Sequence, residues 1–199
     1  QDALRLSRTM SYKSSFAGLQ YGGAKAVIME TSLLLEHREQ VFAAYAKFIE
    51  SLDGQFITGT DVGLTSRDLE VMAKNSRYIV GTKVSPEHFT ALGLLYAIEA
   101  GLEHFYQDNK LENRTFSILG LGKVGLSILE LLYPTADQIY VSDLDGRKTE
   151  AAKKSFPRII VRSPLELINQ PVDIFIPCAV GAAINHQNVS LLRCKAIIG

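Results

Sequence analysis

Hydrophobic residues in the first part of the chain recur mostly at helical spacing. Leu4, Leu6, Met10 and Phe16 stand among polar residues and predict a helix over residues 3–16. Residues 37–52 repeat this period and end at Asp53-Gly54, which predicts a second helix and its stop. The apolar run at residues 26–29 predicts a buried strand, and residues 55–58 predict a strand leading into Asp61. Residues 65–68 read Thr-Ser-Arg-Asp, the form of a capping box, and predict a helix to about residue 74.

The pattern changes after a long helix predicted from about residue 87 to residue 106, just past Pro86. Short apolar runs now alternate with helical periods. The predicted strands are 116–119, 139–142, 159–161, 172–176 and 196–198, and the predicted helices are 124–132, 147–156, 164–168 and a short one before the last strand. This alternation favours an α/β fold in which helices cover both faces of a Rossmann-like, doubly wound parallel sheet.

Composition and charge limit the classes of partner. The 199 residues are 47% hydrophobic and 21% charged, as in an ordinary globular chain with a buried core. Lys and Arg total 21, as do Asp and Glu, so no net charge attracts nucleic acid or an anionic membrane. No apolar run reaches the roughly 18 residues that a membrane span needs, and the start lacks the plan of a secretory signal. We therefore expect small-molecule partners.

Cysteine and histidine usage points to no metal. Cys178 and Cys194 fit no ligand spacing and are too few for a disulfide framework, so reduced thiols in a cytoplasmic protein are expected. The four histidines are scattered without a ligand motif. The chain starts at Gln1 and ends at Gly199 directly after a strand-like run, so we expect a piece of a longer protein.

A glycine motif follows the first strand of the alternating region. Gly120, Gly122 and Gly125 form GxGxxG, in which the glycines allow a tight turn, backbone approach to a pyrophosphate and close packing of helix on strand. The helix that begins there, near Lys123 and Val124, offers its N-terminal N–H groups to phosphate, and the ammonium of Lys123 could add charge. Asp143 ends the next strand, where a carboxylate binds an adenosine ribose and repels a 2′-phosphate. The motif predicts a dinucleotide site that prefers NAD to NADP; a structural glycine turn is the plain alternative.

Two lysines and a carboxylate lie upstream in glycine-containing segments. Lys13 ends Met-Ser-Tyr-Lys, Lys25 ends Gly-Gly-Ala-Lys, and Asp61 lies in Thr-Asp-Val-Gly. Oxidation of an amino acid at its α-carbon needs a cation for the carboxylate, a base for the ammonium proton and a group that activates water. Each residue alone could equally be a solvated side chain or a turn cap.

These motifs together resemble the glutamate/leucine/phenylalanine/valine dehydrogenase family across essentially all 199 residues. The wording around Asp61 and the compact stretch between Lys25 and Asp61 are closer to the leucine, phenylalanine and tryptophan branch. The matching stretches are residues 3–13, 22–25, 57–63, 90–93, 120–125 and 177–185. The resemblance implies a partial α/β substrate domain of the dimerisation type over residues 1–84 and an NAD-binding Rossmann domain over residues 85–199. It also implies a homo-oligomer for the complete protein.

The resemblance implies a role for each residue. Lys13 would pair with the substrate carboxylate, helped by backbone at Gly22 and Gly23. Lys25 would activate water and Asp61 would move protons to and from the substrate nitrogen, while Gly59 would leave room for a nonpolar side chain. The remaining cofactor contacts are Thr90 at the nicotinamide carboxamide and Ala179 and Val180 along the cofactor.

The implied activity is reversible oxidative deamination of a nonpolar L-amino acid, leucine-, valine- or phenylalanine-like, to a 2-oxo acid and ammonia. The family usually carries a longer glycine-containing stretch between Tyr78 and Thr90, and further segments before and after the region matched here. A non-catalytic NAD-binding relative, or an inactive piece of such an enzyme, is therefore the alternative. A dehydrogenase of a non-amino substrate is a third reading, and the two lysines with Asp61 disfavour it.

Overall fold

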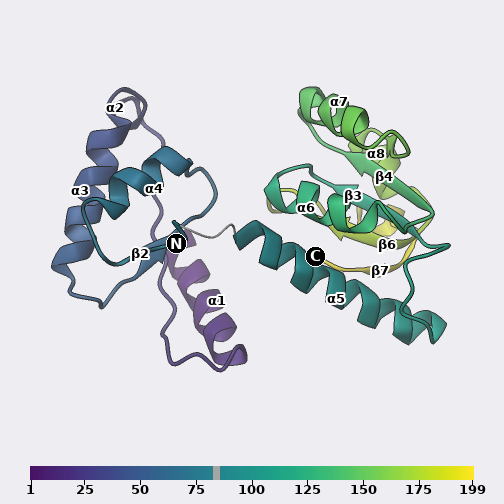
Figure 1. Cartoon of the computed structure of the whole chain (residues 1–199), viewed down its shortest axis with the longest axis horizontal. Helices are drawn as coiled ribbons and strands as arrows, with labels where there is room; N and C mark the ends of the chain where they lie inside the picture. Colours follow the sequence, from purple (N-terminus) through teal and green to yellow (C-terminus); the bar gives the residue numbers. More distant parts are fainter. Residues whose placement is uncertain (83–85) are drawn as a thin grey trace. The chain divides into compact units, whose positions relative to one another are not determined.

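The chain folds into two compact units, residues 1–85 and residues 86–199 (Figure 1). The structure is a computed structural model that describes residues 1–82 and 86–199. The predicted domain boundary between residues 84 and 85 lies outside the described residues.

The first unit is mainly helical. Three of its helices confirm the predicted ones: α1 (Asp2–Phe16), α3 (Arg38–Ser51) and α4 (Ser66–Ala73). The five-residue α2 (Ser32–Glu36) was not predicted, because it is too short to show a helical period. Its N-terminus is capped by Thr31, whose hydroxyl accepts a hydrogen bond from the backbone N–H of Leu34.

The core of this unit lies between α3 and α4, which Figure 1 shows side by side. The helical period buries one face of each helix, and the buried residues include Phe42, Ala46, Ile49, Val71 and Met72. The predicted capping box is confirmed: Thr65 accepts the N–H of Asp68, and the Asp68 carboxylate accepts the N–H of Thr65.

The two strands predicted in this unit differ from the observed ones. The buried strand predicted over residues 26–29 is wrong, because this segment has no strand and exposes Val27, Ile28 and Met29. An apolar run becomes a strand only where a second segment completes its hydrogen-bond ladder. Of predicted residues 55–58, only Thr58 is in a strand, in the two-residue β1 (Thr58–Gly59), which pairs in parallel with β2 (Ile79–Val80).

The second unit has the predicted alternation of strands and helices. Its helices are α5 (Pro86–Tyr106), α6 (Lys123–Leu132), α7 (Gly146–Ser155) and α8 (Pro164–Ile168), with a 3-10 turn η1 (Val189–Leu191) where the short helix was predicted. The strands are β3 (Thr115–Leu119), β4 (Gln138–Ser142), β5 (Ile160–Val161), β6 (Val172–Pro177) and β7 (Cys194–Ile197). They form one parallel sheet in the order β5-β4-β3-β6-β7.

Helices cover both faces of this sheet, because alternate residues of each buried strand point to opposite sides. Phe116 and Ile118 of β3 share a core with α5, α6 and α7, and Figure 1 shows α5 and α6 lying next to one another. Leu119 of β3 and Phe175 of β6 point the other way and pack with Leu167 and Ile168 of α8. The doubly wound arrangement predicted from the sequence is confirmed.

The strand order reverses at β3. The chain leaves β3 through α6 to β4 on one side and later returns to β6 on the other side. In open parallel sheets, ligands bind at the carboxyl ends of the two strands that flank such a reversal. The residues that follow β3 and β6 are therefore the candidates for a ligand-binding site.

Candidate functional site

Gly120 and Gly125 are glycines for reasons of packing at the end of β3. Gly120 has φ +97°, and a Cβ there would lie 2.7 Å from the backbone nitrogen of Ala179. A Cβ on Gly125 would lie 1.9 Å from the carbonyl oxygen of Gly120. The structure thus brings together the first and third glycines of the motif and Ala179, which follows β6.

Gly122 has no such packing reason. It is the N-cap of α6 with no side-chain capping bond, and no heavy atom of residues 1–82 or 86–199 lies within 4 Å of a Cβ built on it. The N-terminus of α6, at Lys123 and Val124, carries the N–H groups that a helix cannot satisfy internally. Open space beside uncapped N–H groups is what a phosphate needs.

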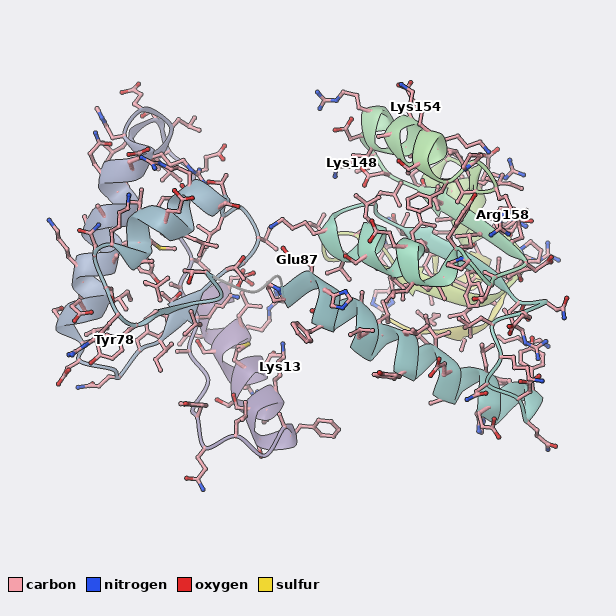
Figure 2. The ribbon with its side chains drawn as sticks, viewed as in Figure 1. Lys13, Tyr78, Glu87, Lys148, Lys154 and Arg158 are labelled. Carbon is pink, nitrogen blue, oxygen red and sulfur yellow. The ribbon has the colours of Figure 1, made fainter. Side chains whose placement is uncertain are left out.

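Asp143 lies next to the glycine loop. Its carboxylate accepts the N–H of Leu121 at 2.7 Å and the N–H of Asp145 at 2.8 Å, and Lys148 of α7, labelled in Figure 2, lies 3.5 Å away. Burial opposes its charge, but these hydrogen bonds outweigh burial and hold the pKa of Asp143 below its usual value. The side chain is therefore ionised at neutral pH and fixes the loop as well as facing it.

Lys123 is paired with an acidic residue that the sequence did not reveal. Its ammonium lies 2.7 Å from the carboxylate of Glu87, which Figure 2 labels in the first turn of α5. No local pattern could have identified Glu87, because 36 positions separate the two residues. Thr90 follows one turn later on α5 and is exposed; its hydroxyl donates to the carbonyl of Pro86 at 2.9 Å.

The residues after β6 differ in their surroundings. Ala179 contacts Gly120 closely, as described, whereas the side chain of Val180 is 75% exposed. Cys178 lies between Pro177 and Ala179, and burial raises the pKa of its thiol to about 11. At neutral pH this thiol is protonated and packs as a small apolar side chain.

In the first unit, Lys25 and Asp61 lie in direct contact. The Lys25 ammonium donates to one carboxylate oxygen of Asp61, and the other oxygen accepts the N–H of Val62 at 2.7 Å. The Lys25 side chain is 24% exposed and that of Asp61 is 46% exposed, so solvent and a small molecule can reach the pair. Lys25 and Asp61 are 36 positions apart in the sequence, and the fold of the first unit brings them into contact.

The other predicted substrate residues lie on or after α1 and in β1. Lys13 is exposed on α1, and Gly23 packs on the same helix: its N–H donates to the hydroxyl of Ser11 at 2.9 Å, and a Cβ there would lie 2.0 Å from the carbonyl oxygen of Ser7. Gly22 next to it is exposed. Gly59 lies in β1, where a Cβ would come within 2.6 Å of the carbonyl oxygen of Val80, so its lack of a side chain has a packing reason.

Within residues 1–82 and 86–199, no group of three His, Cys, Asp or Glu side chains could hold a metal ion. Over the same residues, no helix is long and apolar enough to cross a membrane.

Comparison with known proteins places this geometry in context. Residues 1–78 match the family model of the Glu/Leu/Phe/Val dehydrogenase dimerisation domain. The whole chain is 36% identical to L-tryptophan dehydrogenase of Nostoc punctiforme and 32% identical to leucine dehydrogenase of Thermoactinomyces intermedius, and in each case it covers 56% of the relative. The chain thus spans about half the length of these relatives.

Solved structures agree with the fold. A crystal structure of L-tryptophan dehydrogenase from Nostoc punctiforme superposes over 100% of this chain and 57% of that chain, with a TM-score of 0.77 and 37% identity. A glutamate dehydrogenase from Thermus thermophilus gives a TM-score of 0.76 at 17% identity over 99% of this chain and 55% of that one. The second likeness supports the fold alone, and both agree with the predicted α/β architecture.

Proposed function

We propose that the chain belongs to the Glu/Leu/Phe/Val dehydrogenase family, whose model matches residues 1–78, and that the protein catalyses the reversible oxidative deamination of a nonpolar L-amino acid with NAD as cofactor. The products are a 2-oxo acid, ammonia and NADH. The observation that carries this proposal is the contact between Lys25 and Asp61, because it joins a proton donor and a proton acceptor in one accessible place.

The second unit supports the choice of cofactor. The open space at Gly122 and the N-terminus of α6 suit a pyrophosphate, and the carboxylate of Asp143 suits an adenosine ribose. Because that carboxylate is ionised, a 2′-phosphate beside it would be repelled, which favours NAD over NADP. We assign further cofactor contacts to Thr90, Ala179 and Val180. When bound, the nicotinamide ring supplies the hydride acceptor.

The first unit supports the substrate assignments. The exposed ammonium of Lys13 is suited to pair with the substrate carboxylate. The N–H of Gly23 is already donated to Ser11, so of the two glycines Gly22 is the better placed to donate a further backbone hydrogen bond to that carboxylate.

Proton transfers at the α-carbon fall to the paired residues. Asp61 takes a proton from the substrate ammonium, which frees the nitrogen lone pair as the α-carbon loses its hydride. Lys25 acts as the neutral amine after its ammonium proton has passed to solvent, and takes a proton from the water that adds to that carbon. Asp61 returns its proton to the nitrogen, which leaves as NH3 while Asp61 takes the proton of the new hydroxyl and a carbonyl forms. Asp61 then releases that proton to solvent, and the NH3 binds a proton from solvent and becomes ammonium. The balance is one amino acid, one NAD and one water consumed, and one 2-oxo acid, one ammonium ion, one NADH and one proton formed.

A single lysine substitution tests the assignment. Lys25→Ala should lower amino-acid-dependent NADH formation by at least about a hundredfold, the usual scale of a lost acid-base group, while NAD binding measured by calorimetry is unchanged. Lys47→Ala, on the exposed face of α3, is the matched control and should keep the rate. A full rate in Lys25→Ala would remove Lys25 from the chemistry. NAD binding by the unmodified protein without any amino-acid-dependent NADH would favour a non-catalytic NAD-binding relative.

The substrate class has its own test. Leucine, valine, phenylalanine and tryptophan should each support more NADH formation than glutamate at equal concentration. A clear preference for glutamate would contradict a nonpolar substrate.

We also propose that the complete protein is a homo-oligomer that works in the cytoplasm. The matched family model is described as a dimerisation domain, and Cys178 and Cys194 are free thiols, as suits a reducing compartment. Sedimentation at several concentrations tests the first statement, and fractionation of source cells tests the second.

A further inference from the structure

We propose that Arg38 is a positioning residue that holds the Asp61 loop, residues 60–64, in the place where its carboxylate meets Lys25. This inference rests on the proposed function, because it concerns the same carboxylate. It comes from three hydrogen bonds that Arg38 makes with residues far from it in sequence.

The guanidinium of Arg38 binds two groups at once. Its Nε and one terminal nitrogen donate to the two carboxylate oxygens of Asp68, at 2.8 Å and 2.7 Å. The same terminal nitrogen also donates to the carbonyl oxygen of Gly63 at 2.7 Å. Arg38 opens α3 and Asp68 lies in the first turn of α4, so one side chain links two helices to the loop.

Asp68 is a fixed anchor for this link. Its side chain is only 3% exposed, and one of its oxygens also accepts the N–H and the hydroxyl of Thr65, each at 2.7 Å. A buried carboxylate with all these donors has one well-defined orientation. The guanidinium that pairs with it is therefore also fixed, and its third contact fixes Gly63.

Gly63 lies two residues after Asp61, in the same hydrogen-bonded turn, so a fixed Gly63 restricts where Asp61 can lie. Gly63 has φ +83°, so the chain turns there, and the N–H of Leu64 donates to the carbonyl of Asp61 at 3.2 Å across the turn. At the other end of the loop, Gly59 is held against Val80 in the β1–β2 pair. Asp61 stands between these two supports. Without Arg38, the turn at Gly63 keeps only the supports at its flanks, the β1–β2 pair at Gly59 and the capping box at Thr65.

Arginine suits this position better than lysine. A planar guanidinium can make a two-pronged contact with Asp68 and still direct an N–H at Gly63, whereas one ammonium group cannot reproduce that fork. Arg38→Lys should therefore keep the charge opposite Asp68 and lose the support of the loop. The matched control is Arg67→Lys, because Arg67 lies beside Asp68 in sequence but pairs with Glu39 and Glu70 in more than half-exposed ion pairs.

The first measurement is steady-state kinetics with an amino acid and NAD. Arg38→Lys should lower kcat by about tenfold, since a shift of about 1 Å in a catalytic group can cost up to about a hundredfold. The KM for the amino acid should change less than about twofold, because Lys13 and Gly22 bind the carboxylate and lie on other segments. Arg67→Lys should change neither value. Equal values for Arg38→Lys and the unmodified protein would overturn the proposal.

The second measurement needs no activity. Lys25 must break its contact with Asp61 before its nitrogen can attack an acylating reagent. Its rate of acetylation, read by mass spectrometry against exposed Lys47, therefore reports the contact. Arg38→Lys should raise that rate by about threefold, as should Asp61→Asn, and the double variant should show no further rise, as expected for coupled sites. An unchanged rate in Arg38→Lys would overturn the positioning role, even in a protein without dehydrogenase activity.

The two measurements separate the two proposals. If Asp61→Asn leaves NADH formation unchanged, the proposed catalytic role of Asp61 fails, while the labelling result still decides whether Arg38 positions the loop. If Arg38→Lys unfolds, the double variant Arg38→Leu with Asp68→Asn leaves no buried charge unpaired and has no side-chain donor at position 38, so it removes the bond to Gly63. The same kinetic and labelling shifts are then expected from that variant.

Discussion

Alanine at Gly122 and alanine at Gly125 should fail in different ways, although the two glycines are three residues apart in one loop. Gly125→Ala places a Cβ 1.9 Å from the Gly120 carbonyl oxygen. In real structures a Cβ essentially never comes within 3.0 Å of a heavy atom outside its own residue and its chain neighbours. The backbone at Gly120, directly after β3, and the first turn of α6 must therefore separate by about 1.1 Å. Gly122→Ala meets no atom of the described part of the chain within 4 Å, and its backbone, φ −73° and ψ −171°, suits any residue.

The displacement sets the expected loss of stability. α6 carries Ile128, Leu129 and Leu132, all fully buried against the sheet, and moving it opens that packing. Forced overpacking costs typically about 1–3 kcal/mol, and a clash with backbone belongs at the upper end, so we expect about 3 kcal/mol for Gly125→Ala. In a domain of this size that lowers the Tm by about 10 °C or more. Gly122→Ala should stay within about 0.5 kcal/mol of the unmodified protein.

Gly122→Ala should weaken NAD binding although it leaves stability nearly unchanged. A methyl group at Gly122 occupies the open space that we assign to the pyrophosphate, and we expect the Kd for NAD to rise at least tenfold, about 1.4 kcal/mol. Thermal unfolding followed by circular dichroism gives the Tm of each variant, and titration calorimetry well below both Tm values gives the Kd. Each variant is the control for the other.

Two results would refute this reasoning. Unchanged NAD affinity in Gly122→Ala would mean that the phosphates do not approach there, and the glycine loop would be a structural turn. An unchanged Tm in Gly125→Ala would mean that α6 can move off β3 at no cost, against the close contact seen in the structure.

Three further outcomes follow from buried polar groups. Burial opposes the charge of Asp68, but hydrogen bonds from Arg38 and Thr65 hold its pKa below the usual value of about 3.9. The folded state therefore binds fewer protons than the unfolded state near this pH. The resulting stabilisation is present above about pH 4 and is lost as the pH falls through the folded-state pKa. The urea midpoint should therefore fall less steeply below about pH 4 in Asp68→Asn. Because burial raises the pKa of the Cys178 thiol to about 11, alkylation at pH 8 should be at least about a hundredfold slower in the folded protein than in urea, as mass spectrometry can show. Asp173→Ala removes the acceptor for the N–H and hydroxyl of Thr115 and for the hydroxyl of Tyr106, and should cost about 2–3 kcal/mol in urea unfolding, whereas an equal midpoint would show that water replaces these bonds.

Much of the second unit could be predicted from the sequence because its signals are local. Each strand and helix of the alternation, the GxGxxG loop over residues 120–125 and, in the first unit, the capping box at Thr65 depend on residues close together in the sequence. The same reasoning failed at residues 26–29, where an apolar run resembles a strand but pairs with no segment among the residues that the structure describes. It also missed α2, whose five residues are too few to show a period.

The sequence by itself determined which residue types could perform the chemistry: a dinucleotide loop, an acidic residue after the next strand, and lysines with a carboxylate upstream. Only the tertiary structure decided which of them meet. Lys25 reaches Asp61 across 36 residues, Lys123 reaches Glu87 across 36, and Arg38 reaches Gly63 across 25. Such contacts exist only after helices and strands have packed, because side-chain hydrogen bonds act over about 3 Å and no local pattern encodes which distant segments the core will bring that close.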